Sequence, residues 1–306
     1  MTARRVLVVR ARGFCAGVVR AIHTVERLLE RHGAPVYVRR AIVHNRHVVA
    51  DLTARGAVFV DELDQVPGGG LVVLSAHGVA RRVERQAAER GLRAVDATCP
   101  LVAKVHHEVE RFVAEGYDVV LVGHAGHDEV VGTLGRAPGV KLVARPSDVA
   151  SLVVRDPDRV ACVAQTTLVP GEVDAVVAAL RGRFPRLRLP PTDDICYATR
   201  NRQRAARWLA DRCDTVLVLG DQASSNGHRL REVASDRCPA HLIGSITGLD
   251  PDQPVGIETV GLTAAASTPE SLVRAAVEFF AARGATISEE ELDVEPTWFP
   301  TPALPA

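Results

Sequence analysis

The six cysteines of this chain, at positions 15, 99, 162, 196, 213 and 238, are its residues best suited to metal or redox chemistry. The chain is 306 residues long and contains no Cys-x-x-Cys pair, so the cysteines do not form the pattern of a disulfide framework. Taken singly, a cysteine is more often a small core residue than a ligand. A shared context is needed to single out any that bind metal.

Cys15, Cys99 and Cys196 share such a context, because each precedes a helical pattern that leads into a β-branched strand. Each unit then contains a second strand that ends in a polar loop. These loops contain Ser75-Ala76-His77, Gln165-Thr166-Thr167 and Ser267. The pattern predicts three α/β units: residues 15–98, 99–195 and 196–285, the last completed by the strand within 1–14, followed by a C-terminal tail at 286–306.

The first strand of each unit also ends in a polar loop. His44 lies 29 residues after its cysteine, and His127 and Ser224 each lie 28 residues after theirs. Loops at the carboxyl ends of parallel strands gather at one edge of a sheet. A pseudo-threefold arrangement of the units would therefore direct these loops and the three cysteines toward a common centre.

Each of the three cysteines is expected at a helix N-terminus, where the helix dipole and free N–H groups stabilise a thiolate. Three such thiolates could bind zinc and leave one position open. They could equally hold three corners of an iron–sulfur cubane and leave one iron open. The spacing alone does not choose between these two metal sites.

A set of short motifs in a fixed order narrows the choice. The motifs are Gly13-Phe14-Cys15-Ala16-Gly17-Val18, Val43-His44-Asn45, Ser75-Ala76-His77-Gly78-Val79, Asp96-Ala97-Thr98-Cys99-Pro100, Gln165-Thr166-Thr167-Leu168, Asn201-Arg202-Gln203, Ser224-Ser225-Asn226 and Ala266-Ser267-Thr268-Pro269-Glu270. From about Gly13 to Glu270 the chain resembles the 4-hydroxy-3-methylbut-2-enyl diphosphate reductase family, the LytB-type iron–sulfur reductases.

This resemblance implies three small α/β domains around a central 4Fe-4S cluster, with Cys15, Cys99 and Cys196 as ligands and the fourth iron open to substrate. It also implies the removal of an allylic hydroxyl with two electrons and two protons, which yields isopentenyl and dimethylallyl diphosphate. The electron donor it implies is a ferredoxin or a flavodoxin. The residues implied to bind the substrate diphosphate are His44, His77, His127, Ser224, Ser225, Asn226 and Ser267. The residues implied to act at the hydroxyl are Glu129, Thr166 and His127, with Glu129 as the proton donor.

The sequence departs from the family pattern at several positions. Val19 replaces an aspartate, Asp128 a proline, Arg200 a glutamine, Ala223 an asparagine and Gly227 a serine. Asp128 would raise the pKa of its neighbour Glu129 by like-charge repulsion if the two carboxylates lie close together. These departures keep open an alternative, a diverged paralogue that uses the cluster as a redox or oxygen sensor.

The remaining candidate residues have ordinary structural interpretations. The other three cysteines, 162, 213 and 238, are expected to be structural, and His23, His32, His106, His107 and His241 are expected to be solvated. The segment from His124 through His127 to Glu129 could also suggest a zinc hydrolase, which we keep as a rival enzyme class.

Composition excludes several other classes of protein. Thirty-seven basic residues balance thirty-seven acidic ones, so no net field would attract nucleic acid or an anionic membrane. No apolar run approaches eighteen residues, and the start of the sequence lacks the pattern of a secretory signal. We therefore expect a cytoplasmic protein that does not span a membrane.

Overall fold

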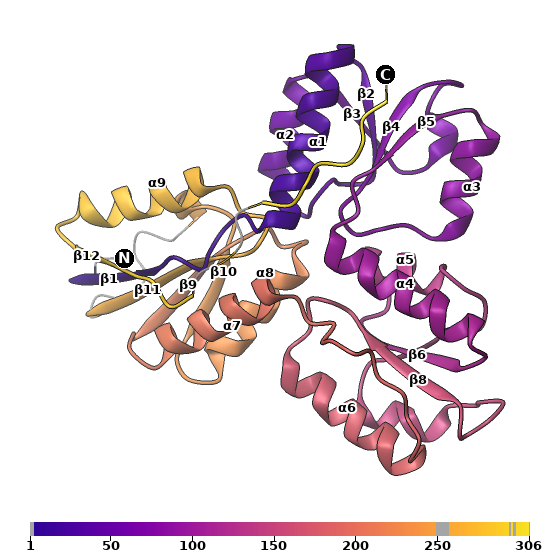
Figure 1. Ribbon diagram of the computed structural model, residues 1–306. Helices are drawn as coiled ribbons and strands as arrows, with labels where there is room; N and C mark the ends of the chain where they lie inside the picture. The colour runs from indigo at the N-terminus through magenta and orange to yellow at the C-terminus, as the bar shows by residue number, and fades with distance from the viewer. Residues whose placement is uncertain (1–2, 249–256, 294, 296–297, 306) are drawn as a thin grey trace. The chain divides into compact units, whose positions relative to one another are not determined.

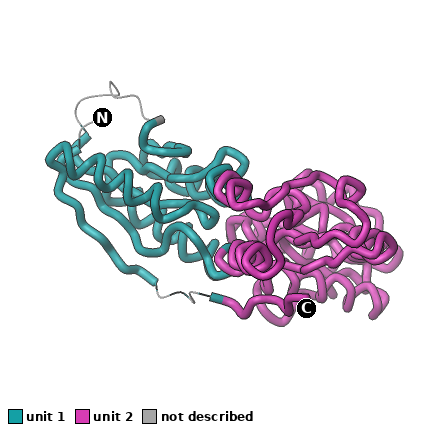
Figure 2. The backbone as a smooth tube through the Cα atoms, turned by 90° about the horizontal axis from the view of Figure 1, so that it is seen from above, with its two compact units in different colours: residues 1–18, 44–48, 197–298 teal, residues 19–43, 49–196, 299–306 magenta. Residues whose placement is uncertain are grey.

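The computed structural model describes residues 3–248, 257–293, 295 and 298–305, and these form three parallel sheets with helices between the strands (Figure 1). The chain divides into two compact units (Figure 2). Unit 1 comprises residues 1–18, 44–48 and 197–298, and unit 2 comprises residues 19–43, 49–196 and 299–306. The expectation of small α/β domains, each built on a parallel sheet, is confirmed. Within the described part of the chain, no helix is both long and apolar enough to cross a membrane.

The first sheet of unit 2 has the strand order β3-β2-β4-β5, with all neighbours parallel. Every residue of β4 is buried, as its unbroken apolar sequence predicts for a central parallel strand. The elements in this part of the chain are α1 (Ala16–His32), β2 (Val36–Arg39), α2 (Arg46–Ala54), β3 (Ala57–Val60), η1 (Leu63–Gln65), β4 (Leu71–Leu74), α3 (Arg81–Glu89) and β5 (Arg93–Asp96).

The second sheet of unit 2 has the order β7-β6-β8, again parallel. Beyond β8 the ladder is reduced to a single parallel bridge between Ala161 and Arg188. The elements here are α4 (Pro100–Ala114), β6 (Asp118–Val122), α5 (Asp128–Leu134), β7 (Lys141–Val143), η2 (Pro146–Ser151), β8 (Val160–Ala164) and α6 (Pro170–Arg183).

The sheet of unit 1 has the order β10-β9-β11-β1-β12, also parallel throughout. The N-terminal strand β1 pairs with β11, so that Arg5 is opposite Thr259. The segment expected as a C-terminal tail begins with a strand, β12, on the other side of β1. The elements are β1 (Arg5–Val9), α7 (Tyr197–Ala210), β9 (Thr215–Leu219), α8 (Ser225–Ser235), β10 (Ala240–Ile243), η3 (Ile246–Gly248), β11 (Thr259–Ala264), α9 (Glu270–Ala281) and β12 (Thr286–Glu290).

The three sheets repeat one arrangement around β4, β8 and β11, which we call the central strands, although β8 is the outermost strand of its ladder and has only the Arg188 bridge on its other side. On one side of each lies the first strand of the repeat, which is β2, β6 or β9. On the other side lies the segment that leads into the next cysteine: β5 before Cys99, the Arg188 bridge before Cys196, and β1 before Cys15. The strand pairing therefore fixes the position of the segment that leads into each cysteine and of the helix that follows it.

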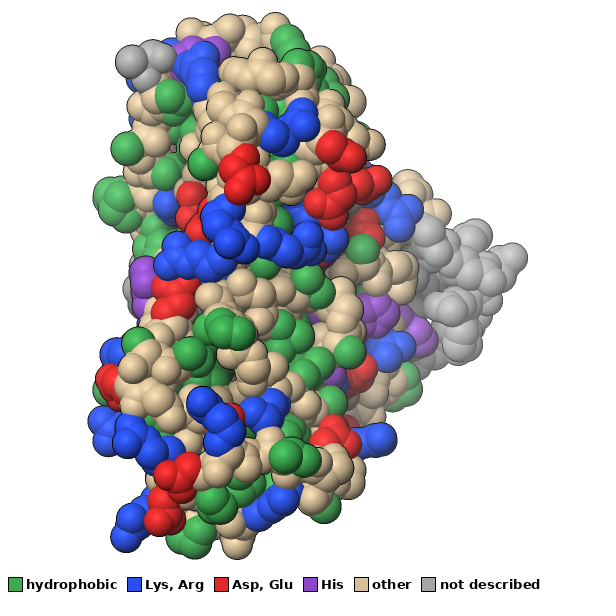
Figure 3. Space-filling model, turned by 90° about the vertical axis from the view of Figure 1, so that its right-hand side faces the viewer, with side chains coloured by type: hydrophobic (Ala, Val, Ile, Leu, Met, Phe, Trp, Pro, Cys, Tyr) green, Lys and Arg blue, Asp and Glu red, His purple; other side chains and the backbone are tan. Residues whose placement is uncertain are grey.

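A charged network joins the two domains of unit 2. Arg136, which follows α5, donates to Glu84 of α3 at 2.6 Å and to Glu110 of α4 at 2.7 Å. Arg81 of α3 reaches the same two carboxylates at 2.9 and 2.7 Å. Seen from the right-hand side of Figure 1, basic side chains form a band across the middle, with acidic ones beside it (Figure 3). The positive charge of this face is thus partly neutralised locally.

Gly78 shapes the loop that carries His77. Its φ is +75°, and a Cβ atom there would lie 2.4 Å from the His106 ring of α4. His106 is buried, so our expectation that it is solvated is wrong. Burial and then the charge of Arg136 lower the pKa of His106 to about 4. A neutral imidazole packed under Gly78 therefore supports the loop.

Gly78→Ala should destabilise the fold more than Gly91→Ala does. Both glycines have positive φ, which costs an alanine about 1–2 kcal/mol. Only Gly78 also faces a neighbour, so we expect its variant to lose roughly 1–3 kcal/mol more. Urea unfolding measures this difference. Combining His106→Ala with Gly78→Ala should recover part of the extra loss, because it removes the clashing ring, whereas combining it with Gly91→Ala should recover none. Equal losses in Gly78→Ala and Gly91→Ala would contradict the packing argument.

Candidate functional site

The three cysteines of the repeat are held in the same way. Cys15, Cys99 and Cys196 each directly precede a helix, α1, α4 or α7. The backbone amide of each donates to the carbonyl of the second residue past a central strand. The acceptors are Ala266 after β11 for Cys15 (3.3 Å), Ala76 after β4 for Cys99 (3.0 Å) and Thr166 after β8 for Cys196 (3.1 Å). The same hydrogen bond thus fixes all three cysteines to the polar loops.

The other three cysteines differ in environment. Cys162 lies in β8 and is buried, and burial raises the pKa of its thiol to about 12. Burial likewise raises the pKa of Cys213 to about 12 and that of Cys238 above its usual value. Groups held as neutral thiols are poor metal ligands. Cys15, Cys99 and Cys196 are partly exposed, as Cys238 also is, but they alone among the six cysteines directly precede a helix with their amides bonded to the polar loops. The donor set at these equivalent positions therefore suits a metal cluster.

In unit 1 the structure brings together several residues expected to bind diphosphate. Ser267 Oγ donates to the carbonyl of His44 at 2.9 Å, and Asn226 Oδ1 accepts from the amide of Ala266 at 2.9 Å. Ser224 caps α8, its Oγ accepting from the amide of Gly227 at 3.1 Å.

Asn226 also carries a buried donor, Nδ2, that has no hydrogen-bond partner among the described residues. A buried donor without a partner is costly, which suits an anionic ligand at the start of α8.

An ion pair stabilises the same loops of unit 1. Asp221 accepts from both the backbone N and the Nε of Arg46, at 3.0 and 2.9 Å. Of the departures nearby, Gly227 leaves room for Leu242, whose Cδ1 would lie 3.0 Å from an added Cβ. Ala223 is exposed, and nothing in the structure explains the departures at Val19 and Arg200.

In unit 2, Glu129 is buried against Thr166. Its Oε1 accepts from the Thr166 amide at 2.7 Å, and its Oε2 accepts from Thr166 Oγ1 at 3.0 Å. Burial raises the pKa of Glu129 to about 7, with a contribution from the charge of Asp194, although the Thr166 donors oppose the rise. A carboxyl group with this pKa can hold a proton at neutral pH and release it during a reaction.

His127 caps the helix that carries Glu129. Its Nδ1 accepts from the Glu129 amide at 3.2 Å, so in the neutral ring the proton is on Nε2. The rings of His77 and His127 meet edge to face, with centroids 6.1 Å apart. Four of the predicted residues, His77, His127, Glu129 and Thr166, therefore gather within unit 2.

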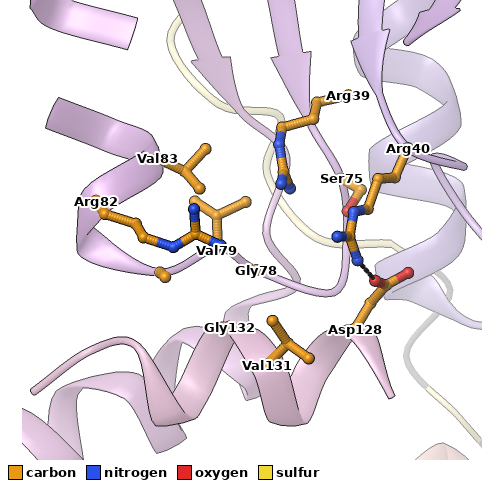
Figure 4. Close-up of a pocket in the computed structure, with 11 residues that line it drawn as sticks. Arg39, Arg40, Ser75, Gly78, Val79, Arg82, Val83, Asp128, Val131 and Gly132 are labelled. Carbon is orange, nitrogen blue, oxygen red and sulfur yellow. Dashed lines mark hydrogen bonds and ion pairs between the residues drawn. The ribbon is translucent and has the colours of Figure 1, made fainter. Parts of the chain in front are cut away.

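Asp128 forms an ion pair with Arg40, as Figure 4 shows. Arg40 adopts a φ of +58°, a left-handed conformation that is uncommon outside glycine. The pKa of Glu129 is raised, but Asp128 is not among the groups that raise it. Burial and the charge of Asp194 cause the rise instead. An acidic residue in the first turn also suits the dipole of α5.

A pocket of unit 2 surrounds this ion pair. In Figure 4, the side chains of Arg39 and Arg40 extend toward the pocket from the end of β2, and that of Arg82 extends toward it from α3. Helix α5 forms the opposite side of the pocket. The lining residues are Arg39, Arg40, Ser75, Gly78, Val79, Ala80, Arg82, Val83, Asp128, Val131 and Gly132. None of the residues expected to bind substrate or cluster lines it.

The segment from His124 to Glu129 does not have the geometry of a zinc hydrolase. Both oxygens of Glu129 are engaged by Thr166, and Nδ1 of His127 accepts a backbone amide. Among the residues that the structure describes, ligand atoms of His124, His127 and Glu129 do not gather within 4.8 Å of one another.

Sequence reasoning missed two residues beside this site, Lys104 and Asp194. Asp194 is buried two residues before Cys196, accepts from Lys104 and from the amide of Ala164, and contributes to the high pKa of Glu129. The sequence contained one signal that could have drawn attention to Lys104: the chain has only two lysines among its thirty-seven basic residues.

These features define an α/β protein with three parallel sheets and three equivalent cysteines, each at the start of a helix. A family model described as LytB protein matches residues 6–281. A 4-hydroxy-3-methylbut-2-enyl diphosphate reductase of Mycolicibacterium vanbaalenii is 52% identical over 287 residues, which cover 93% of this chain and 85% of that protein. A protein of the same name from an Azoarcus species is 50% identical and covers 99% of this chain and 98% of its own.

The solved structure of the E-1-hydroxy-2-methyl-but-2-enyl-4-diphosphate reductase from Plasmodium falciparum is similar, with a TM-score of 0.93 and 35% identity. The match covers 96% of this chain and 94% of that one. The chain belongs to the LytB protein family, as its motifs predicted.

The pKa of Glu129 predicts a specific pH dependence of stability. Folding raises this pKa from 4.5 to about 7, so the folded state binds the proton more tightly than the unfolded state. The resulting stabilisation is full below pH 4.5 and is lost as the pH rises through about 7; it amounts to roughly 3 kcal/mol. Glu129→Gln should remove this dependence.

Urea unfolding of the wild type, Glu129→Gln and Asp128→Asn over this pH range is the measurement. The free energy of unfolding of the wild type should fall relative to Glu129→Gln as the pH rises. Asp128→Asn, which alters the adjacent carboxylate, should retain the wild-type slope. Parallel curves for the wild type and Glu129→Gln would show that Glu129 does not titrate in this range.

Proposed function

We infer that this chain is a 4-hydroxy-3-methylbut-2-enyl diphosphate reductase. The reaction replaces the allylic C–OH bond with C–H, consumes two electrons and two protons, and releases water with isopentenyl or dimethylallyl diphosphate. One observation carries the proposal. The three cysteines that the family motifs single out occupy equivalent places, each with its amide bonded to the loop after a central strand.

We propose that Cys15, Cys99 and Cys196 hold a 4Fe-4S cluster, consistent with membership of a family of iron–sulfur enzymes. Three partly exposed thiols fit three corners of a cubane. When bound, the cluster would supply electrons and an open iron that acts as a Lewis acid toward the hydroxyl, which is otherwise a poor leaving group. The remaining requirements are a diphosphate anchor and a proton source, and other side chains provide these.

The anchor proposed here consists of His44, His77, His127, Ser224, Ser225, Asn226 and Ser267. In support of it, the buried Nδ2 of Asn226 and the start of α8 supply donors without a large net charge. Histidine and serine side chains add further donors suited to phosphate oxygens. Binding of the diphosphate to such an anchor would orient the hydroxyl for reaction.

Glu129 is the proposed proton donor to the departing hydroxyl, with Thr166 as its partner. Its raised pKa keeps the group protonated below about pH 7. Thr166 Oγ1 donates to the Glu129 carboxylate. When Glu129 is protonated, its O–H would donate to Thr166 Oγ1 instead, and the Thr166 hydroxyl would pass its own proton on to a substrate oxygen. His127 fixes the backbone of Glu129 through the N-cap hydrogen bond to its Nδ1, which leaves the proton of the neutral ring on Nε2 as the donor proposed for the diphosphate.

The electron donor proposed is a low-potential ferredoxin or a flavodoxin, as the family resemblance implies. A sensor function, the alternative that the sequence left open, has no specific support in the described residues. The decisive experiment is turnover of 4-hydroxy-3-methylbut-2-enyl diphosphate with an artificial reductant under strict exclusion of oxygen. Binding without reduction would instead indicate a diverged paralogue.

Serine substitution should sort the cysteines into two groups. Cys15→Ser, Cys99→Ser and Cys196→Ser should each lose most of the bound iron and the activity, because each removes one corner of the cluster. Matched controls are Cys162→Ser, Cys213→Ser and Cys238→Ser, which should retain iron. Iron analysis with a visible spectrum gives the result, and full iron loading in Cys99→Ser would refute the three-thiolate model.

Glu129→Gln should retain its cluster and bind substrate, yet lose about 10²-fold or more in turnover, the usual scale for a general acid. The wild-type turnover number should decline as the pH rises through about 7, because the carboxyl group then loses its proton. Asp128→Asn is the control and should keep most of its activity. Near-normal turnover in Glu129→Gln would place the proton source elsewhere.

A further inference from the structure

Each helix that follows one of the three cysteines carries a cation five or six residues after it. These cations are Arg20 on α1, Lys104 on α4 and Arg202 on α7. Each donates to the backbone just before a different cysteine of the set. The order is cyclic along the sequence. The cation on the helix after Cys15 contacts the segment before Cys99, the cation after Cys99 contacts the segment before Cys196, and the cation after Cys196 contacts the segment before Cys15.

Lys104 makes the most complete of these contacts. Its ammonium group donates to the carbonyls of Thr192 and Asp193 at 2.7 and 2.8 Å and to Asp194 Oδ1 at 2.9 Å. Each of its three N–H donors therefore has one acceptor. Asp194 Oδ2 in turn accepts from the amide of Ala164 at 2.8 Å, at the end of β8. Lys104 thus ties the approach to Cys196 to the helix of Cys99.

Arg20 and Arg202 make the corresponding contacts with guanidinium groups. Arg20 donates to the carbonyl of Thr98, the residue before Cys99, at 2.9 Å. Arg202 donates to the carbonyl of Gly13, two residues before Cys15, at 2.9 Å. Arg202 is one of the most buried large side chains, and Glu295 neutralises it with both carboxylate oxygens at 2.9 Å.

The identity of Lys104 supports a specific fit. The chain has thirty-five arginines and only two lysines, so arginine is its usual cation. A compact ammonium group directs three donors from a single atom, whereas a guanidinium spreads its donors in a plane over three nitrogens, so the two cations do not fit the same set of oxygens. The other lysine, Lys141, has a similar setting without a cysteine nearby in sequence. It donates to Asp118 at 2.8 Å, and the exposed fractions of the two side chains, 26% and 6%, match the 25% and 5% of Lys104 and Asp194.

We propose that Arg20, Lys104 and Arg202 are positioning residues that hold the segments before Cys99, Cys196 and Cys15 in the conformation that ligates the cluster. This rests on the proposed function, because it assumes that the three cysteines hold one cluster. Side chains that orient metal ligands commonly change metal affinity by about 10–100-fold when removed. The backbone before each cysteine would otherwise sample many conformations, and ordering it would oppose cluster binding.

Lys104→Met and Arg20→Met test the proposal, with Lys141→Met and Arg183→Met as matched controls. Arg183 is a suitable control for Arg20 because it also donates to backbone carbonyls, of Ala150 and Leu152 at 2.8 and 2.7 Å, away from the three cysteines in sequence. Lys104→Arg keeps the charge and changes the shape, size and donor geometry of the cationic group. The readouts are the rate of iron loss to a chelator from the reconstituted holoprotein and amide hydrogen exchange in the cluster-free protein.

We expect Lys104→Met and Arg20→Met to lose iron about tenfold faster than wild type, and the two controls to stay within about twofold of it. In the cluster-free protein, exchange should rise at residues 192–196 in Lys104→Met and at 97–99 in Arg20→Met, each variant acting on its own segment. Lys104→Arg should resemble Lys104→Met in both readouts, because charge alone does not restore the three-donor fit.

Iron loss and local exchange equal to those of the controls would overturn the proposal. A uniform rise in exchange across the protein, with iron loss that only follows thermal stability, would also overturn it by showing general destabilisation. A wild type that takes up no cluster would refute the proposed function. The exchange data would still report whether the cations order these segments, so the two failures can be told apart.

Discussion

The hydrogen bond from each cysteine amide to the loop after a central strand is the constraint on which the rest of this structure depends. It joins the start of α1, α4 and α7 to the loops after β11, β4 and β8. Each bond contributes only about 1 kcal/mol, but it fixes a cysteine relative to a strand that is buried and cannot shift easily. The loops that carry Ser267, His77 and Thr166 are held by the same bonds, so a cluster and its substrate would share one set of supports.

Charge is distributed so that one buried carboxyl group has a raised pKa while its acidic neighbours are paired with cations. Glu129 is buried beside Thr166 and has a pKa of about 7. Asp128, the adjacent residue, is turned to Arg40, and Asp194 is turned to Lys104. An unpaired second carboxylate at this place would compete for the proton and raise the cost of burial. The pairing explains how a departure from the family pattern at Asp128 is compatible with an acid at Glu129.

The sequence predicted the central strands and the helices after the cysteines because their apolar periodicity is strong. β12 was not predicted, since Thr286–Glu290 is polar and becomes a strand only by pairing with β1, where Glu289 meets Arg12 at 2.7 Å. The motifs located the cysteines and the polar loops. They could not reveal Asp194 as a neighbour of Glu129, the left-handed Arg40 or the contacts of Lys104, because tertiary packing creates these relations between distant parts of the sequence.

The central claim is that three cysteines hold a cluster with one iron left for substrate. Mössbauer spectroscopy of isotopically enriched, anaerobic protein tests it most directly. The account predicts about four irons per chain, of which one differs from the others and shifts on addition of 4-hydroxy-3-methylbut-2-enyl diphosphate but not of the corresponding free alcohol. Four irons with the same cysteine coordination, unchanged by the diphosphate, or a protein that contains zinc and no iron, would contradict it.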